Sequence, residues 1–444
     1  MTTSPKTKHP ANPPVAAPAG VTLETIGKKG DASPAPFLRA ELPNGLRVLM
    51  RENRSAPLVA VDCWLGVGAL HEEEEHAGIS HFLEHMFFKG TERYPLGSMD
   101  QLVKSMGGYN NAATSMEFTH YYIVTPSEHF ETALDLLADH LRNPAFPEAE
   151  LERERGVVKE EIRRRNDSPQ GRLYVTLSEH LFGDSPYARE VLGSPESLDR
   201  VSASVMRDYW RRHYRSDRLA VAMAGDLDPD LALAAVAERL GDLERSDAPP
   251  PTATPAPATL DVEPLTMDIA QGYLAWGFRT AGRSDLDEAC ALEVAVTALG
   301  DGMTSRLYRR LVDERRLVTS VGAWTYALDR AGVLGISAVL PPDRRREVEE
   351  ETARVLEEAA AGLGADEIGR AKTMLAADFA FDNETNAATT GTLGEFEVVH
   401  GGAGRYREIL DGIARVTPKT ATEVVERLAR PDRAVRAWVG PNGA

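Results

Sequence analysis

Two histidines and one glutamate near the N-terminal end have the spacing of a hydrolytic metal site. His81 and His85 are four residues apart in residues 79–88, whose apolar periodicity predicts a helix, so both imidazoles share one helix face. Glu84 lies beside them, close enough to reach a metal-bound water without having to be a ligand itself. Two neutral nitrogen ligands and a carboxylate base are the components of a zinc site that activates water. The pattern His-x-x-Glu-His therefore predicts a zinc-dependent hydrolase.

A five-residue pattern also arises by chance, so the interpretation needs a third ligand. Residues 148–165 have helical periodicity, and Glu154 and Glu161 fall on the apolar stripe of that helix. The apolar members of the stripe are Leu151, Val157, Val158 and Ile162. Carboxylates that face a core are usually paired or bound to metal, because burying them alone is costly. We predict Glu161 as the third ligand and Glu154 as a supporting carboxylate, whereas Glu160 points away from the stripe and should be solvated.

Other interpretations of these residues remain open at this point. Two helical histidines next to apolar residues are often ordinary core or surface residues. Residues 71–76 form a rival metal cluster, His-Glu-Glu-Glu-Glu-His, but consecutive charges splay around the backbone and usually indicate a solvated loop. Residues 401–404 are Gly-rich but lack the Lys-Ser/Thr of a phosphate-binding loop, so we expect an ordinary loop there.

Composition excludes several classes of protein. With 42% hydrophobic and 27% charged residues, the 444-residue chain is a globular protein long enough for two or three domains. A net charge of −18 argues against nucleic acid as a partner. Cys63 and Cys290 lie in apolar runs and are predicted to be buried thiols rather than a disulfide. No apolar stretch is long enough for a membrane span or a secretory signal, so we expect no membrane association and a cytoplasmic location.

The chain is predicted to consist of two similar units. Strand-like residues 58–65 precede the helical run 79–88, and strand-like residues 272–278 precede a helical run at 286–299, which suggests a duplicated α+β unit. The expected segments are a flexible Pro/Ala-rich tail at 1–36, a metal-bearing domain at 37–245, a Pro-rich linker at 246–260 and a homologous domain without metal at 261–444. Ten of the eleven histidines precede the linker, so a histidine metal site belongs to the first half.

Three longer segments resemble the pitrilysin and insulin-degrading family of zinc peptidases, and most closely its half-length branch, which includes the mitochondrial processing peptidase beta subunit. They are residues 78–91 (GISHFLEHMFFKGT), 107–115 (GGYNNAATS) and 152–161 (ERERGVVKEE). The likeness extends over residues 38–441. It implies one Zn²⁺ per chain, with His81, His85 and Glu161 as ligands, Glu84 as the base and Glu154 in support.

The resemblance also implies an architecture and a way of binding substrate. The fold would be α+β, with two homologous domains, each a mixed or antiparallel sheet covered by helices, that together form one half of a clamshell chamber. An extended peptide would add as a further strand to an edge strand formed by Asn111, Ala112, Ala113 and Thr114. From the residues alone, an ordinary paired strand is the preferred interpretation of this segment.

One departure from the family pattern concerns the second domain. After the segment 302–308, the family carries an Arg and a Tyr that reach the substrate, and the matching residues here are Val312 and Thr319. This implies that a homologous partner subunit supplies the pair in a heterodimer. The predicted function is a zinc metalloendopeptidase acting on short or unfolded polypeptides. The alternatives are a non-hydrolytic structural or peptide-binding subunit of the same fold and an enzyme dedicated to one precursor peptide.

Overall fold

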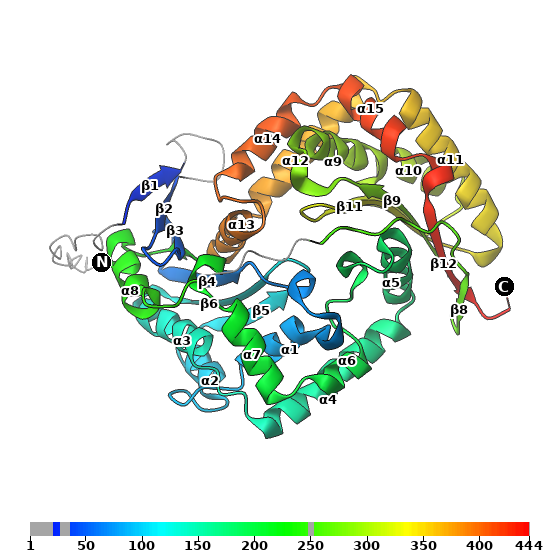
Figure 1. The fold of residues 1–444 in the computed structure, drawn as a ribbon. Coiled ribbons are helices and arrows are strands. Elements are labelled where there is room, and N and C mark those ends of the chain that lie inside the picture. The colour runs from blue at the N-terminus through cyan, green and yellow to red at the C-terminus, as the bar shows by residue number, and fades with distance from the viewer. Residues whose placement is uncertain (1–20, 27–35, 247–252, 444) are drawn as a thin grey trace, which may run out of the picture.

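The computed structural model describes residues 21–26, 36–246 and 253–443, which fold into two α+β units (Figure 1). The first unit contains a seven-stranded sheet in the order β1-β2-β3-β7-β4-β6-β5. Only the β3–β7 pair is parallel. The strands are β1 (Leu23–Ile26), β2 (Phe37–Glu41), β3 (Arg47–Glu52), β4 (Leu58–Leu65), β5 (Tyr109–Thr114), β6 (Thr119–Pro126) and β7 (Leu219–Gly225). The helices are α1 (Ile79–Phe87), α2 (Ser98–Ser105), α3 (Phe130–Arg142), α4 (Glu148–Asp167), α5 (Pro169–Phe182), α6 (Pro195–Arg200), α7 (Ala203–His213) and α8 (Pro229–Leu240).

The second unit contains a five-stranded sheet in the order β10-β11-β9-β12-β8, in which only β12 and β8 run parallel. The strands are β8 (Leu265–Met267), β9 (Gly272–Thr280), β10 (Ser320–Ala327), β11 (Gly332–Leu340) and β12 (Val435–Pro441). The helices are α9 (Leu286–Gly300), α10 (Arg306–Tyr308), which continues as a π-helical segment (Arg309–Glu314), α11 (Arg345–Ala361), α12 (Ala365–Phe381), α13 (Asn386–Val398), α14 (Arg405–Arg415) and α15 (Pro418–Leu428).

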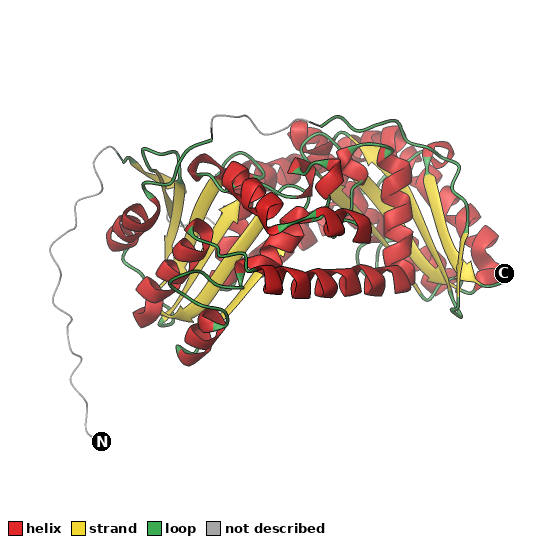
Figure 2. Cartoon of the chain, turned by 60° about the horizontal axis from the view of Figure 1, so that its bottom comes forward, coloured by secondary structure: helices red, strands yellow, loops and turns green. Residues whose placement is uncertain are grey.

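The two units repeat one order of elements. A central strand leads into a helix and then into a hairpin that forms the sheet edge, as β4, α1, β5 and β6 in the first unit and as β9, α9, β10 and β11 in the second. The predicted α+β fold of two mixed sheets covered by helices is confirmed, and both sheets are seen with their helices in Figure 2.

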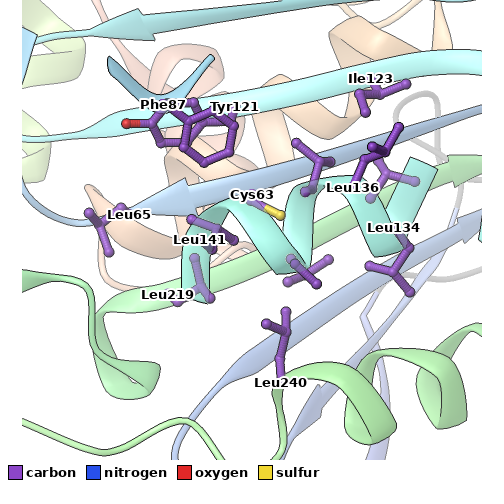
Figure 3. Packing of buried hydrophobic residues seen from close by; sticks show 14 of the residues in the cluster. Cys63, Leu65, Phe87, Tyr121, Ile123, Leu134, Leu136, Leu141, Leu219 and Leu240 are labelled. Carbon is purple, nitrogen blue, oxygen red and sulfur yellow. The ribbon is translucent and has the colours of Figure 1, made fainter. Parts of the chain in front are cut away.

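The hydrophobic core of the first unit fixes the position of α1. Leucines of α3 and α8 pack on one face of the sheet against residues such as Cys63 and Ile123 (Figure 3). At the end of α1, the ring of Phe87 stacks on that of Tyr121 in β6 with 3.8 Å between centroids. Both rings are almost completely buried. Since a fully buried large side chain contributes about 2–3 kcal/mol, these contacts tie α1 to the sheet.

Each unit covers part of the other unit's sheet. Helix α5 packs on β9 and β12, and α13 packs on β4 and β7. Glycine permits both approaches, because a Cβ on Gly277 would lie 2.8 Å from Leu181 and one on Gly394 would lie 2.1 Å from Trp64. The two units are therefore interlocked through these helices.

Several expectations about the connecting segments need qualification. Residues 23–26 of the expected tail form β1, which pairs with β2, while residues 1–20 and 27–35 lie outside the described residues. Residues 253–260 of the expected linker have no regular structure, yet Arg279 donates to the carbonyl of Pro255 at 2.9 Å, so this part is packed against the protein. Residues 247–252 lie outside the described residues.

Two further expectations concern the cysteines and membranes. Cys63 and Cys290 are buried free thiols, as predicted. In the described part of the chain, no helix combines the length and the apolar character that a membrane span requires.

Candidate metal centre

A buried carboxylate accepts hydrogen bonds from backbone N–H groups at the start of helix α1. Glu72 accepts hydrogen bonds from the backbone N–H of Gly78 at 2.7 Å and of Ser80 at 2.8 Å, and its residue is only 5% exposed. It thereby satisfies two of the N–H groups that a helix N-terminus leaves without a partner. The solvated loop expected for residues 71–76 is thus wrong for Glu72, although Glu73, Glu74 and Glu75 are exposed. The segment folds back on the helix that follows it, which charge counting does not reveal.

Because the Glu72 carboxyl is buried, we expect the free energy of unfolding of this chain to depend on pH. Burial raises its pKa from an ordinary 4.5 to about 7, although the N–H donors partly oppose this rise. The folded chain then binds this proton more tightly, so the stability it contributes is full below about pH 4.5 and is lost as the pH rises through about 7. The loss amounts to about 3 kcal/mol.

The measurement is the free energy of unfolding, obtained by chemical denaturation of the zinc-free protein across this pH range. Glu72→Gln should lack the decrease with pH, and the exposed-site control Glu73→Gln should retain it. An unchanged slope in Glu72→Gln would contradict the assignment.

The three predicted ligands converge. His81, His85 and Glu161 each offer an atom, and the three atoms lie within 4.8 Å of one another. One oxygen of Glu161 is 3.6 Å from His81 Nε2 and 3.7 Å from His85 Nε2. Both histidines lie on α1 and Glu161 lies on α4, and the two helices pack against each other. In the residues that the structure describes, no other group of three such side chains has this geometry.

The donor set suits a zinc ion. Burial, and then the proximity of His85, lowers the pKa of His81 to about 4, so its ring is neutral and able to donate a lone pair. His81 Nδ1 is buried and has no hydrogen-bond partner among the described residues. Two imidazoles and one carboxylate form the three-ligand set of many catalytic zinc sites, in which one coordination position remains for water or substrate.

Glu154 lies behind one of the ligands. Its carboxylate is 3.1 Å from His85 Nδ1 and 2.7 Å from the amine of Lys89, and the residue is 7% exposed. Burial alone would raise the pKa of Glu154, but the hydrogen bonds from Lys89 and His85 outweigh it and hold the pKa below its ordinary value. The ionised carboxylate holds a proton on Nδ1 and leaves Nε2 free to bind metal. Lys89 was not singled out from the sequence, although it lies four residues after His85.

Replacing Glu154 should weaken zinc binding without removing a ligand. Glu154→Gln is expected to lower zinc affinity about 10- to 100-fold, because the His85 ring loses the partner that fixes its proton and orientation. Chelator competition on the purified protein measures this change. Glu152→Gln on the same helix, where the side chain is exposed and pairs with Arg155, is the matched control and should bind zinc as the wild type does. Unchanged affinity in Glu154→Gln would contradict the supporting role.

Glu84 lies on α1 next to the metal ligands. Its carboxylate accepts a hydrogen bond of 2.5 Å from the hydroxyl of Thr114, the last residue of β5. Burial raises the pKa of Glu84, and the Thr114 hydrogen bond offsets this only in part. From the sequence we predicted Thr114 to be part of the substrate-binding strand, but we did not predict that it contacts Glu84. A carboxylate with a raised pKa, held by one hydroxyl, is suited to accept and return a proton.

Helix α4 carries Glu154 and Glu161, but one part of its predicted stripe is wrong. Leu151, Val158 and Ile162 are buried, whereas Val157 is 41% exposed. Val157 and Val158 are adjacent, so they differ by about 100° around the helix, and only Val158 faces α1 and the core. Glu160 is exposed, as predicted.

The segment 111–114 is part of β5, the edge strand of the first sheet. Its exposure alternates, with Tyr109, Asn111 and Ala113 exposed and Asn110, Ala112 and Thr114 partly buried. β5 pairs with β6 on one side, and no described strand pairs with its other side. The strand ends at Thr114 and therefore lies beside Glu84.

The second unit repeats part of this arrangement without the ligands. Glu293 of α9 is partly buried and accepts a hydrogen bond from the hydroxyl of Thr325 in the edge strand β10, as Glu84 does from Thr114 in β5. Burial raises the pKa of Glu293. The neighbouring α9 positions carry apolar residues in place of histidines. The duplication thus extends to an acid–hydroxyl pair, but among the residues described a group of side chains that could hold a metal ion is found only in the first unit.

Val312 and Thr319 both precede β10 in the chain. Val312 lies in the π-helical segment and packs against the core of the second unit, while Thr319 is exposed and donates to the carbonyl of Val339. Arg315, which lies between these two positions in the sequence, pairs with Glu347 at 2.9 Å.

Known proteins resemble this chain in sequence and in fold. An uncharacterized zinc protease of Mycobacterium tuberculosis is 32% identical over 427 residues, which cover 94% of this chain and 97% of that protein. An uncharacterized zinc protease of Bacillus subtilis is 29% identical over 407 residues, covering 90% and 97%. Among solved structures, a protease from Helicobacter pylori matches with a TM-score of 0.84 at 23% identity and covers 91% of this chain and 99% of that chain. Pitrilysin matches with a TM-score of 0.78 at 20% identity and covers 95% of this chain but 46% of its own.

Family models match both units in chain order. Residues 47–195, which include His81, His85 and Glu161, match the insulinase (peptidase family M16) model, and residues 200–375 match the peptidase M16 inactive domain. The absence of histidines around Glu293 agrees with the second description. Together the matches cover more than half of the sequence, and the chain belongs to the insulinase family of peptidases, family M16.

Proposed function

We propose that this chain is a zinc-dependent endopeptidase that hydrolyses short or unfolded polypeptides. The observation that carries the proposal is the convergence of His81, His85 and Glu161 within 4.8 Å, with Glu84 on the same helix as the two histidines. Relatives that cover almost the whole chain are named zinc proteases, which supports zinc as the ion.

The chain's own residues account for the proton transfers. When bound, zinc supplies Lewis acidity that lowers the pKa of water and polarises a peptide carbonyl. Glu84 takes the proton from the attacking water and later delivers it to the leaving amine. Thr114 fixes the carboxylate of Glu84, and Glu154 fixes the ring of His85.

We further propose that substrate binds to β5 as an added strand. The unpaired side of β5 offers backbone N–H and C=O groups to an extended peptide, irrespective of its sequence. Because β5 ends at Thr114, the bound peptide would pass next to Glu84. Asn111 and Ala113 would contact it on the exposed face, and Ala112 and Thr114 on the face toward α1.

A homologous subunit is proposed to complete the site. Val312 and Thr319 supply neither the charge nor the ring of the Arg and Tyr that the family resemblance leads one to expect, and Arg315 is already paired. This chain covers 46% of pitrilysin, which supports a role as one half of a larger enclosure. The proposed partner carries the Arg and Tyr and lacks its own ligands.

The experiment is a cleavage assay on an unstructured peptide, with the zinc-loaded chain alone and with a homologous chain that carries the Arg and Tyr. The proposal expects zinc at one equivalent per chain and efficient cleavage only in the mixture. Equal activity of the chain alone would refute the heterodimer and leave the peptidase intact. A zinc-loaded mixture that cleaves no peptide would refute the peptidase and favour a structural or peptide-binding subunit.

A further inference from the structure

A second polar pocket lies on α1 and does not include the metal ligands. It has a volume of about 170 Å³ and lies between the first turn of α1, residues 71–76 and helix α7. The helices α1 and α7 lie side by side (Figure 1). The residues that matter for its chemistry are His71, Tyr209, Arg212 and His213.

Hydrogen bonds determine which nitrogen of each ring carries the proton. His71 Nδ1 accepts from the backbone N–H of Gly68 at 3.1 Å, and His213 Nδ1 accepts from the guanidinium of Arg218 at 2.8 Å. Burial, and then the charge of Arg218, lowers the pKa of His71 to about 4 and that of His213 to about 3. Both rings are therefore neutral, and because their Nδ1 atoms act as acceptors, both carry the proton on Nε2.

These two Nε2–H groups are unsatisfied donors that open into the pocket. Neither has a hydrogen-bond partner among the residues that the structure describes, and neither is sealed from solvent. His213 is only 5% exposed and lines this pocket. Both N–H groups are unused by the protein and line one small pocket, so they are available to a ligand that accepts hydrogen bonds.

The tautomers argue against a second metal ion. A metal needs the lone pair of Nε2, so each proton would have to move to Nδ1, where it would face the N–H of Gly68 or of Arg218. An acceptor needs no such change. The charge of Arg218 acts on both rings. Two carboxylates lie at the rim of the pocket, and each has its negative charge balanced by an arginine. Glu73 pairs with Arg212 at 2.7 Å, and Asp208 lies 3.7 Å from Arg211.

We propose that this pocket binds a small oxyanion, either a phosphate or a carboxylate, through the Nε2–H groups of His71 and His213. The site adjoins the metal helix, because Tyr209 shares a hydrogen bond of 2.7 Å with the hydroxyl of Ser80, the residue before His81. An anion bound here stabilises the contact between α7 and α1. The inference does not depend on peptidase activity.

Calorimetric titration of the full-length, zinc-loaded chain with inorganic phosphate, and separately with acetate, tests the proposal. We expect saturable binding of one equivalent, weakened about 10-fold or more in His71→Phe and in His213→Phe, because each variant removes one hydrogen bond to a charged ligand. His180→Phe on α5, whose Nδ1 contacts a helix carbonyl, is the control and should bind as the wild type does. The tighter of the two anions identifies the class. Absence of saturable binding by both would overturn the proposal, as would a second zinc equivalent that the same variants abolish.

A spectroscopic measurement keeps the test decisive if a variant fails to fold. Long-range ¹H–¹⁵N spectra of the histidine side chains in the wild-type protein report which nitrogen carries the proton. The proposal expects Nε2–H tautomers for both rings and shifts of their resonances on addition of the bound anion. Nδ1–H tautomers, or resonances that do not respond, would refute it.

Discussion

Glu84→Gln will retain zinc and lose peptide hydrolysis by about 10²- to 10⁴-fold, the usual contribution of a general acid–base group. Glutamine keeps the size of the side chain and can still accept from Thr114, but it does not take up a proton. Since Glu84 is not one of the three converging ligands, metal content should not change. The measurement is kcat on an unstructured peptide with zinc determined in the same sample.

The control for this prediction is Glu160→Gln. Glu160 is exposed on α4 and pairs with Arg163 at 2.5 Å, so its replacement should leave both kcat and zinc unchanged. Substantial hydrolysis by zinc-loaded Glu84→Gln would mean that another group moves the proton. Loss of zinc together with activity would instead mean that Glu84 supports the metal.

Glu161→Gln should lower zinc affinity by more than about 100-fold, which exceeds the 10- to 100-fold typical of a supporting residue such as Glu154. The substitution removes the negative charge from the only carboxylate among the three converging side chains, and an amide is a weak ligand for zinc. Hydrolysis should fall in parallel and recover in part at high zinc concentration. Competition with a chelator of known affinity measures the change.

The adjacent Glu160→Gln again provides the matched control, because it alters the same helix and the same net charge at an exposed position. If Glu161→Gln bound zinc as tightly as that control, Glu161 would not be a ligand. Partial recovery of activity by added zinc in Glu161→Gln, and none in Glu84→Gln, separates loss of the metal from loss of the base.

Much of the fold and the central site could be predicted because the signals are local or periodic. The helix at 79–88 and the strand at 58–65 agree with α1 and β4 to within one residue. Helical phase placed Glu154 and Glu161 on the side of α4 that packs against α1. The same phase argument was too coarse for Val157, since one residue changes the direction by about 100°.

Features that depend on tertiary contacts could not be predicted from the sequence. Glu72 looks like any member of an acidic run until the chain folds back and places it at Gly78 and Ser80. The bond between Thr114 and Glu84 joins residues 30 positions apart. Interlocking of the two units was also not predicted, because the apolar face of α5 does not reveal which sheet it covers.

The interlocked helices restrict how this molecule can admit a polypeptide. α5 and α13 each lie on the opposite unit's sheet, and Arg39 of β2 binds Glu397 of α13 at 2.8 Å, so a hinge between the units would have to strip both helices from their sheets. Such a movement would expose the apolar surface that these helices bury, which is costly. If the proposed function holds, the movements that admit a polypeptide and release its fragments would therefore take place at the boundary with the proposed partner subunit and not between the two units of this chain.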